Sequence, residues 1–86
     1  MPELSRFFGI VVTMYYDDHA PPHFHVRYSG QKAVFSIEPL DVLRGRLPPR
    51  ALGLVVEWAS LHRVELEDNW ERARRLGRLK RIAPLE

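Results

Sequence analysis

The residues best suited to chemistry lie in one short segment, residues 17–26. This segment holds three of the four histidines of the chain, His19, His23 and His25, together with Asp17 and Asp18. Imidazole nitrogens bind zinc and other first-row transition metals, and they also exchange protons near neutral pH. The segment therefore predicts either a metal site or a site of acid–base catalysis.

In the metal hypothesis, His23 and His25 are the first two ligands, because residues two apart on a strand project from the same face. His19 could add a third ligand from the preceding loop, which two adjacent prolines stiffen. Asp17 or Asp18 could be a further ligand, or could accept a hydrogen bond from a ligating imidazole and so orient it. The expected cofactor is a divalent transition metal such as zinc. The spacing H-x3-H-x-H lacks the glutamate of the helical H-E-x-x-H motif.

Two alternatives need no metal. In the first, two histidines act as base and acid, for example in RNA cleavage, and Arg27 or Lys32 stabilises the phosphate charge. In the second, the segment is structural, and a loop held by hydrogen bonds presents Phe24 or His25 to a protein partner. The spacing of the residues leaves all three hypotheses open.

The fourth histidine, His62, lies on a predicted helix within its apolar side. A lone histidine there is more often a core residue with local hydrogen-bond partners. If the helix covers the sheet face that carries the other histidines, however, His62 would join them as a fourth metal ligand. The candidate catalytic residues are then His23, His25 and His62. Glu65 and Asn69, one and two turns further on, could orient an imidazole.

The elements that position these residues are predicted from periodicity and turn residues. Alternation and β-branching predict a first strand over residues 6–16, with Gly9 at a bulge. A loop over residues 17–22 leads to a second strand over residues 23–28. The turn Ser29-Gly30-Gln31 joins it to a third strand over residues 32–38. Residues 40–47 are ambiguous, and could form a short edge strand followed by a turn at Arg44-Gly45-Arg46.

One long helix is expected over residues 50–76, opened by Pro48-Pro49 and ended by Gly77. It could bend or break near Asp68-Asn69. Its apolar arc, which would pack on the sheet, consists of Leu52, Val55, Val56, Ala59, Leu66, Trp70 and Ala73. A short terminal strand could follow over residues 80–85, anchored by Ile82. The predicted fold is a single α+β domain over residues 1–86, a small antiparallel β-meander packed by one long α-helix.

Two surfaces could bind macromolecules. Leu54, Trp58 and Leu61 form an apolar patch off the main arc, which predicts a protein partner or self-association as a homodimer, unless residues 40–47 cover it. Positive side chains gather near the C-terminus and could meet nucleic acid, although cations also complement the end of a helix dipole. This basic group consists of Arg74, Arg75, Arg78, Lys80 and Arg81.

Composition narrows the class of protein. The 86 residues include no cysteine, which excludes a disulfide scaffold and a thiolate metal site. The first residues lack the features of a signal peptide, and no apolar run approaches the roughly 20 residues that span a bilayer. A cytoplasmic protein without a membrane partner is therefore expected. The net charge of +2 is too small to indicate a partner by itself.

Several segments together resemble one bacterial family, the domain of unknown function 4160. They are residues 5–10, 14–19, 21–25 and 57–62 and the pair Asn69-Trp70, and the stretch D-H-x-P-P-H-F-H at residues 18–25 is highly specific. The resemblance extends over nearly the whole chain. The positions typical of the family are His19, Pro21, Pro22, His23, His25, Trp58, His62 and Trp70.

The resemblance implies a small cytoplasmic bacterial protein, often encoded beside a protein of the domain of unknown function 2442 family. Such pairing suggests one half of a two-gene toxin–antitoxin-like module that acts through this protein partner. The family supplies no established activity. The alternative function is a histidine-dependent enzyme, either a metal-bound hydrolase or a nuclease, that uses His19, His23 and His25.

Overall fold

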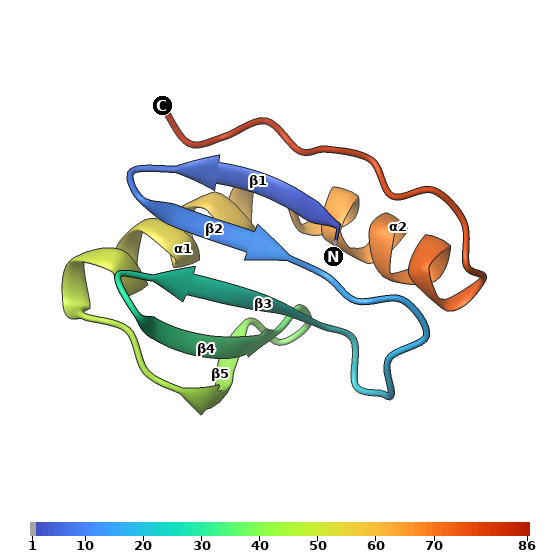
Figure 1. Ribbon diagram of the computed structural model, residues 1–86, viewed down its shortest axis with the longest axis horizontal. Coiled ribbons are helices and arrows are strands. Elements are labelled where there is room, and N and C mark those ends of the chain that lie inside the picture. Colours follow the sequence, from blue (N-terminus) through green and yellow to red (C-terminus); the bar gives the residue numbers. More distant parts are fainter. Residues whose placement is uncertain (1) are drawn as a thin grey trace.

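The computed structural model describes residues 2–86 and has an α+β fold, as predicted (Figure 1). In the described residues, five antiparallel strands form one sheet in the order β1-β2-β3-β4-β5, so the meander is larger than the three strands predicted. The elements are β1 (Glu3–Phe7), β2 (Ile10–Thr13), β3 (His23–Tyr28), β4 (Gln31–Ser36), β5 (Asp41–Gly45), α1 (Pro49–Leu61) and α2 (Arg63–Arg74).

The predicted first strand over residues 6–16 is wrong in its extent, because the chain reverses direction inside it. Phe8 and Gly9 both have positive φ, 50° and 81°, and form the two-residue turn between β1 and β2. Ser29 and Gly30 adopt nearly the same angles, 48° and 83°, in the predicted turn between β3 and β4. Two positive φ values match the right-handed twist of a hairpin. Phenylalanine rarely occupies such a position, and the sequence therefore suggested only a bulge.

The ambiguous residues 40–47 contain the edge strand β5, which includes Arg44 and Gly45 of the predicted turn and ends there. Gly45 pairs with Ala33 at φ +78°, and a Cβ atom at Gly45 would lie 2.1 Å from the Lys32 carbonyl oxygen. Only glycine permits this close approach. The register between β4 and β5 shifts once, and Arg44 then lies opposite Val34.

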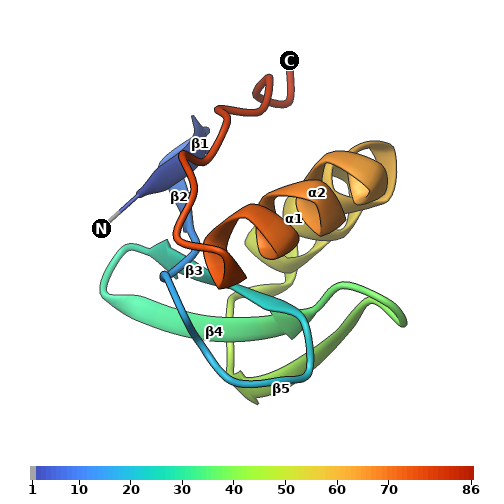
Figure 2. The same ribbon diagram turned by 90° about the vertical axis from the view of Figure 1, so that its right-hand side faces the viewer.

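The predicted long helix is two helices that meet at His62. The His62 backbone, at φ −122° and ψ 29°, leaves the helical region, and its N–H donates to the Ala59 carbonyl. The break predicted near Asp68-Asn69 is therefore six residues too late. Both helices lie on the same side of the sheet (Figure 2). The predicted apolar arc is largely buried, although Val56 is 40% exposed.

Trp58 is completely buried in the core, where its ring packs on Phe7 and Phe24. Its indole N–H donates to the Ala83 carbonyl at 2.8 Å. The prediction that Trp58 belongs to an exposed patch is thus wrong, because α1 turns this residue toward the sheet. Truncating a buried tryptophan costs about 3–5 kcal/mol of stability, so Trp58→Ala would report on folding rather than on partner binding.

The C-terminal segment, residues 77–86, runs beside β1 without forming the predicted strand (Figure 1). One backbone bond, from Ile82 N–H to the Leu4 carbonyl at 2.8 Å, joins the two segments. Ile82 is buried, as expected of an anchor. The side-chain amide of Asn69 bonds both the N–H and the carbonyl of Lys80. Within residues 2–86, neither helix is long and apolar enough to cross a membrane.

Candidate metal centre

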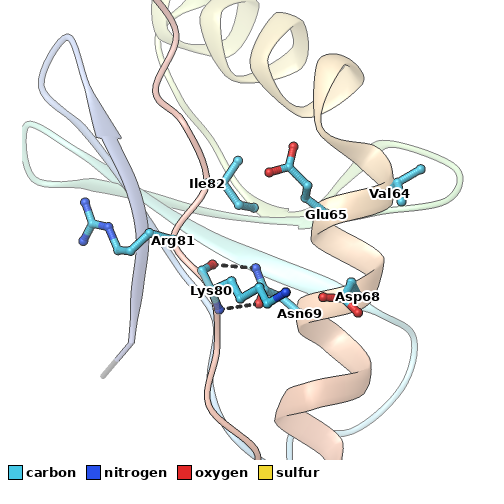
Figure 3. Close-up of a pocket in the computed structure, with 7 residues that line it drawn as sticks. All are labelled: Val64, Glu65, Asp68, Asn69, Lys80, Arg81 and Ile82. Carbon is cyan, nitrogen blue, oxygen red and sulfur yellow. Dashed lines mark hydrogen bonds between the residues drawn. The ribbon is translucent and has the colours of Figure 1, made fainter.

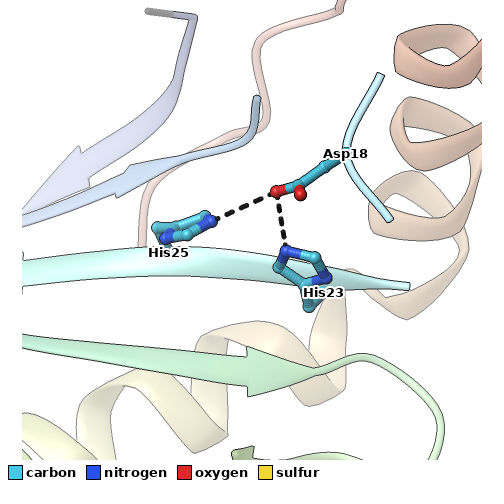
Figure 4. A group of neighbouring side chains, drawn as sticks. All are labelled: Asp18, His23 and His25. Carbon is cyan, nitrogen blue, oxygen red and sulfur yellow. Dashed lines mark hydrogen bonds and ion pairs between the residues drawn. The ribbon is translucent and has the colours of Figure 1, made fainter. Parts of the chain in front are cut away.

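Three of the predicted site residues meet at the start of β3. Asp18 comes from the loop between β2 and β3, His23 is the first residue of β3, and His25 follows two residues later (Figure 4). The Asp18 Oδ2 atom lies 2.8 Å from His23 Nε2 and 3.6 Å from His25 Nε2. One carboxylate oxygen and the two ring nitrogens all lie within 4.8 Å of one another. This spacing is compatible with a single bound cation.

The loop that carries Asp18 is fixed at both ends. At its start, Asp17 takes a positive φ of 52° and donates its N–H to the Ala73 carbonyl of α2 at 3.1 Å. At its end, the carbonyl of Pro22 accepts a bond from the Ile37 N–H. An aspartate tolerates the left-handed conformation better than most residues. The sharp turn at Asp17 therefore directs the next residue, Asp18, back over β3.

The Asp18 carboxylate is held by four neighbouring groups. Its Oδ1 atom accepts bonds from the His19 backbone N–H at 2.9 Å and from His19 Nδ1 at 2.8 Å. Its Oδ2 atom faces His23 and His25. Burial alone would raise the pKa of the Asp18 carboxyl, but the hydrogen bonds from His19 and His23 outweigh burial and hold this pKa well below its usual range. Asp18 is thus an anion at neutral pH.

The ring of His23 is buried and has both nitrogens close to acceptors. Nδ1 lies 2.7 Å from the Pro21 carbonyl oxygen, and Nε2 lies 2.8 Å from Asp18 Oδ2. Trp70 of α2 packs against the ring, with 5.0 Å between centroids. A neutral imidazole has only one N–H, so it cannot donate to both acceptors. The second nitrogen requires either an added proton or a metal ion.

His25 faces the side of the sheet opposite the helices, and Tyr15 packs edge-on against its ring at 4.3 Å. Its Nε2 atom is buried and has no hydrogen-bond partner among residues 2–86. Burial lowers the pKa of the His25 imidazole, an effect that Asp18 opposes and that His23 and Arg44 reinforce. A buried polar nitrogen without a hydrogen-bond partner is costly, which makes this atom a candidate metal ligand.

The remaining histidines are placed differently. His19 lies beside the group and orients Asp18, but its own side chain is 83% exposed. His62 does not join the group, because it lies on the helical side of the sheet. Its ring packs on Trp58, and its Nδ1 pairs with Glu65 Oε1 at 2.5 Å. Glu65 thus contacts only His62, outside the group, and Asn69 bonds only Lys80.

The two surfaces predicted to bind macromolecules are smaller in the structure than the sequence indicated. In the apolar patch, Leu61 is 67% exposed, but Leu54 is half-buried. In the basic group, Arg74 pairs with Glu71 and Arg81 pairs with Glu3. Acidic neighbours therefore neutralise part of the positive charge near the C-terminus. Between α2 and the C-terminal segment lies a hollow of about 350 Å³, lined by residues of both segments (Figure 3).

Arg44 is a residue of the site that the sequence did not indicate. It lines a hollow of about 320 Å³ beside His25 and another of about 170 Å³ beside His19 and His23. The cross-strand row Thr13–His25–Val34–Arg44 explains this position. From the sequence, Arg44 was expected in a turn. Gly45 is the residue that could have indicated a strand, because its lack of a side chain allows β5 to remain paired with β4.

The chain belongs to the family described as domain of unknown function (DUF4160), whose model matches residues 9–71. This confirms the resemblance drawn from the histidine and tryptophan segments. The match includes Asp18, His23 and His25 and ends before the C-terminal segment. Comparisons with curated proteins and with solved structures give no match.

Proposed function

We propose that this protein binds a divalent transition metal, with zinc as the best fit, and acts as a metal-dependent hydrolase. The ligands are the carboxylate of Asp18 and the Nε2 atoms of His23 and His25. The observation that carries the proposal is the convergence of two ring nitrogens on one carboxylate oxygen, with His25 Nε2 buried and without a hydrogen-bond partner.

The hydrogen bonds favour a metal over a proton. The Pro21 carbonyl can only accept, so it fixes the N–H of His23 on Nδ1 and leaves the Nε2 lone pair facing Asp18. A proton on His23 Nε2 would satisfy that contact but would leave His25 Nε2 buried and unpaired. One cation between the three atoms satisfies all of them. A backbone carbonyl behind a ligating histidine is a frequent arrangement in metal sites.

The two distances from Asp18 Oδ2 require only a small adjustment. Tetrahedral ligands about 2.0–2.1 Å from zinc lie about 3.4 Å from one another. The separation of 3.6 Å between Asp18 Oδ2 and His25 Nε2 is close to this value. The separation of 2.8 Å between Asp18 Oδ2 and His23 Nε2 would widen by roughly half an ångström.

Two histidines and one carboxylate leave a coordination position open, as in catalytic rather than structural zinc sites. A metal bound there supplies a Lewis acid and lowers the pKa of a coordinated water. Around it, His19 holds Asp18 Oδ1 and thereby aims Oδ2 at the centre. Trp70 shields His23 from water, and Tyr15 restrains the ring of His25. An open position for water, together with neighbouring residues that hold the ligands in place, supports a hydrolytic reaction.

The test is metal content and metal-dependent hydrolysis in protein purified without a histidine tag. We expect about one zinc or cobalt ion per chain, lost in Asp18→Asn, His23→Ala and His25→Ala but retained in His62→Ala. A panel of p-nitrophenyl esters should be hydrolysed only by the loaded protein. Metal binding that persists in all three ligand variants would contradict the proposed centre, and a loaded protein inert on every ester would contradict the hydrolase.

We also propose, as a second function, that the protein acts through a protein partner as half of a toxin–antitoxin-like module. The supporting observation is an exposed apolar pair, Leu61 and Val64, at the junction of α1 and α2, where they are 67% and 79% exposed. A partner of the domain of unknown function 2442 family would be the first to test. Co-purification with such a partner should be lost in Leu61→Asp and Val64→Asp. A protein that captures no such partner, and whose expression leaves growth unchanged, would contradict this role.

A further inference from the structure

Three cationic side chains line one hollow on the sheet face opposite the helices. They are Arg27 of β3, Lys32 of β4 and Arg44 of β5, and the hollow of about 320 Å³ also exposes His25 and Tyr15. Among residues 2–86, none of the three cations has an ion-pair partner. No carboxylate is among the residues that line the hollow. Its charge is therefore unbalanced.

The arrangement of these cations is unfavourable without an anion. Arg27 and Lys32 are direct cross-strand partners, and like charges opposite each other destabilise a sheet. The C-terminal basic group is built differently, because acidic side chains pair with two of its members, Arg74 and Arg81. An anion placed between Arg27, Lys32 and Arg44 would remove the repulsion and bring opposite charges together.

Arg44 connects this hollow to the metal centre. Its cross-strand row passes through Val34 to His25, a proposed metal ligand that lines the same hollow. On its other side, Arg44 lines the smaller hollow that contains His19 and His23. A ligand held by Arg44 would thus lie beside His25 and His23, two of the residues that would hold the metal. The close approach of Gly45 to Lys32 fixes the backbone from which Arg44 projects.

We infer that this hollow binds the phosphoryl group of a phosphate ester, which makes phosphate esters the substrate class of the proposed hydrolase. The inference rests on the proposed function for the role of His25, and on the cation cluster for the ligand. Three cations suit a group with several charged oxygens better than a single carboxylate. The planar guanidinium groups of Arg27 and Arg44 can each donate two parallel bonds to phosphate oxygens. Thr13 and Tyr15, whose side chains carry hydroxyl groups, also line this hollow.

The experiment measures binding of adenosine 5′-monophosphate to the full chain by calorimetry, in a chelator and again with zinc. Adenosine without the phosphate is the ligand control. Arg44→Gln should weaken binding of the monophosphate about tenfold, since it removes one charge-assisted contact. The matched variant Arg78→Gln, which removes the same charge from the exposed C-terminal segment, should change it by less than about twofold. Arg44→Lys should recover part of the loss, and circular dichroism should be the same for all variants.

Three results would overturn the inference. Adenosine could bind as tightly as its monophosphate, Arg78→Gln could weaken binding as much as Arg44→Gln, or the monophosphate could fail to bind under both conditions. A short oligoadenylate separates two sources of the phosphoryl group. Equal affinity for the monophosphate and the oligoadenylate identifies a small ester as the ligand. Much tighter, salt-dependent binding of the oligoadenylate identifies a polynucleotide strand.

The two proposals fail separately. Monophosphate binding that depends on Arg44 in chelator, together with no zinc binding, would contradict the metal centre and leave the phosphoryl site in place. Zinc binding that is unchanged in Arg44→Gln, together with no monophosphate binding, would contradict the phosphoryl site alone.

Discussion

Two histidine sites in this protein differ in how they satisfy their polar atoms. In the loop site, Asp18 of one segment meets His23 and His25 of another, and both imidazoles present Nε2 to one oxygen. In the helix site, His62 meets Glu65 three residues later on an exposed helical surface, where the carboxylate is 52% exposed. Both contain a histidine next to a carboxylate. Only the loop site leaves a buried ring nitrogen without a partner.

The comparison separates a local hydrogen bond from a site prepared for a ligand. One histidine and one carboxylate at helical spacing satisfy each other, and water completes the remaining contacts. At His23 both ring nitrogens face acceptors, and one neutral imidazole cannot donate to both without an additional proton or metal ion. The balance of donors and acceptors, more than the number of histidines, distinguishes a candidate metal centre.

The largest expected difference between the two sites is in zinc affinity. His23→Ala removes one of three ligands and should weaken zinc binding by at least about 100-fold, since even the loss of a group that only hydrogen-bonds a ligand costs 10–100-fold. His62→Ala should change the affinity by less than about twofold. Competition with a chromophoric chelator measures both variants. Equal losses in the two variants would remove the distinction between the sites.

Zinc should also stabilise the fold through the loop site alone. At a free zinc concentration about 100 times the dissociation constant, binding to the native state raises the free energy of unfolding by about 2.7 kcal/mol. Urea titrations should find this increase in the wild type and in Glu65→Gln. The same titration of His25→Ala should find none. An unchanged increase in His25→Ala would assign the zinc to other residues.

A smaller effect is expected from His19, which contacts Asp18 without joining the group. His19→Ala removes the side-chain bond to Asp18 Oδ1 and should weaken zinc binding about tenfold. His19→Asn, which keeps a donor near the same oxygen, should recover part of this loss. A loss as large as that of His23→Ala would show that His19 is itself a ligand.

The smallest effect concerns the pH dependence of the metal-free protein. Burial is the main reason that the pKa of His25 lies below its ordinary value of 6.5, with Asp18 opposing and His23 and Arg44 adding to the effect. The unfolded chain then takes up a proton at higher pH than the folded chain does, so stability rises with pH. The contribution of neutral His25 to the free energy of unfolding is complete above pH 6.5 and is lost as the pH falls through the pKa of His25 in the folded protein.

In chelator, the urea midpoint should therefore decrease between pH 7.5 and pH 5, roughly the range in which histidine titrates. His25→Gln should have a shallower decrease because it lacks the titrating ring. A midpoint that rises on acidification in the wild type, but not in the variant, would mean that His25 is stabilised in its charged form.

Much of the candidate site could be predicted from the sequence, because its members are close in the chain. His23 and His25 share a strand face by simple alternation, and the adjacent prolines mark the loop that brings in an aspartate. The choice between Asp17 and Asp18 was not predictable. It depends on the positive φ at Asp17 and on its bond to Ala73, which lies 56 positions further along the chain.

The fold was predictable where local signals agree and not where they conflict. Ser29-Gly30 was expected as a turn because glycine favours positive φ. Phe8-Gly9 makes a similar turn but lies inside a run of β-forming residues, so strand propensity outweighed it in the prediction. For Trp58, helical periodicity indicated apolar residues on two sides of α1. Only the position of the sheet decides that the side with Trp58 is buried.

The sequence by itself determined the α+β class, the histidine strand and its loop, and the family. These follow from side-chain alternation, turn residues and a specific motif, all of which act over a few positions. Only the tertiary structure decided that His62 stays apart while Asp18 and Arg44 come close to the histidines of β3. The reason is that α1 covers the face of Phe24, so the sheet separates His62 from His25 on the opposite face.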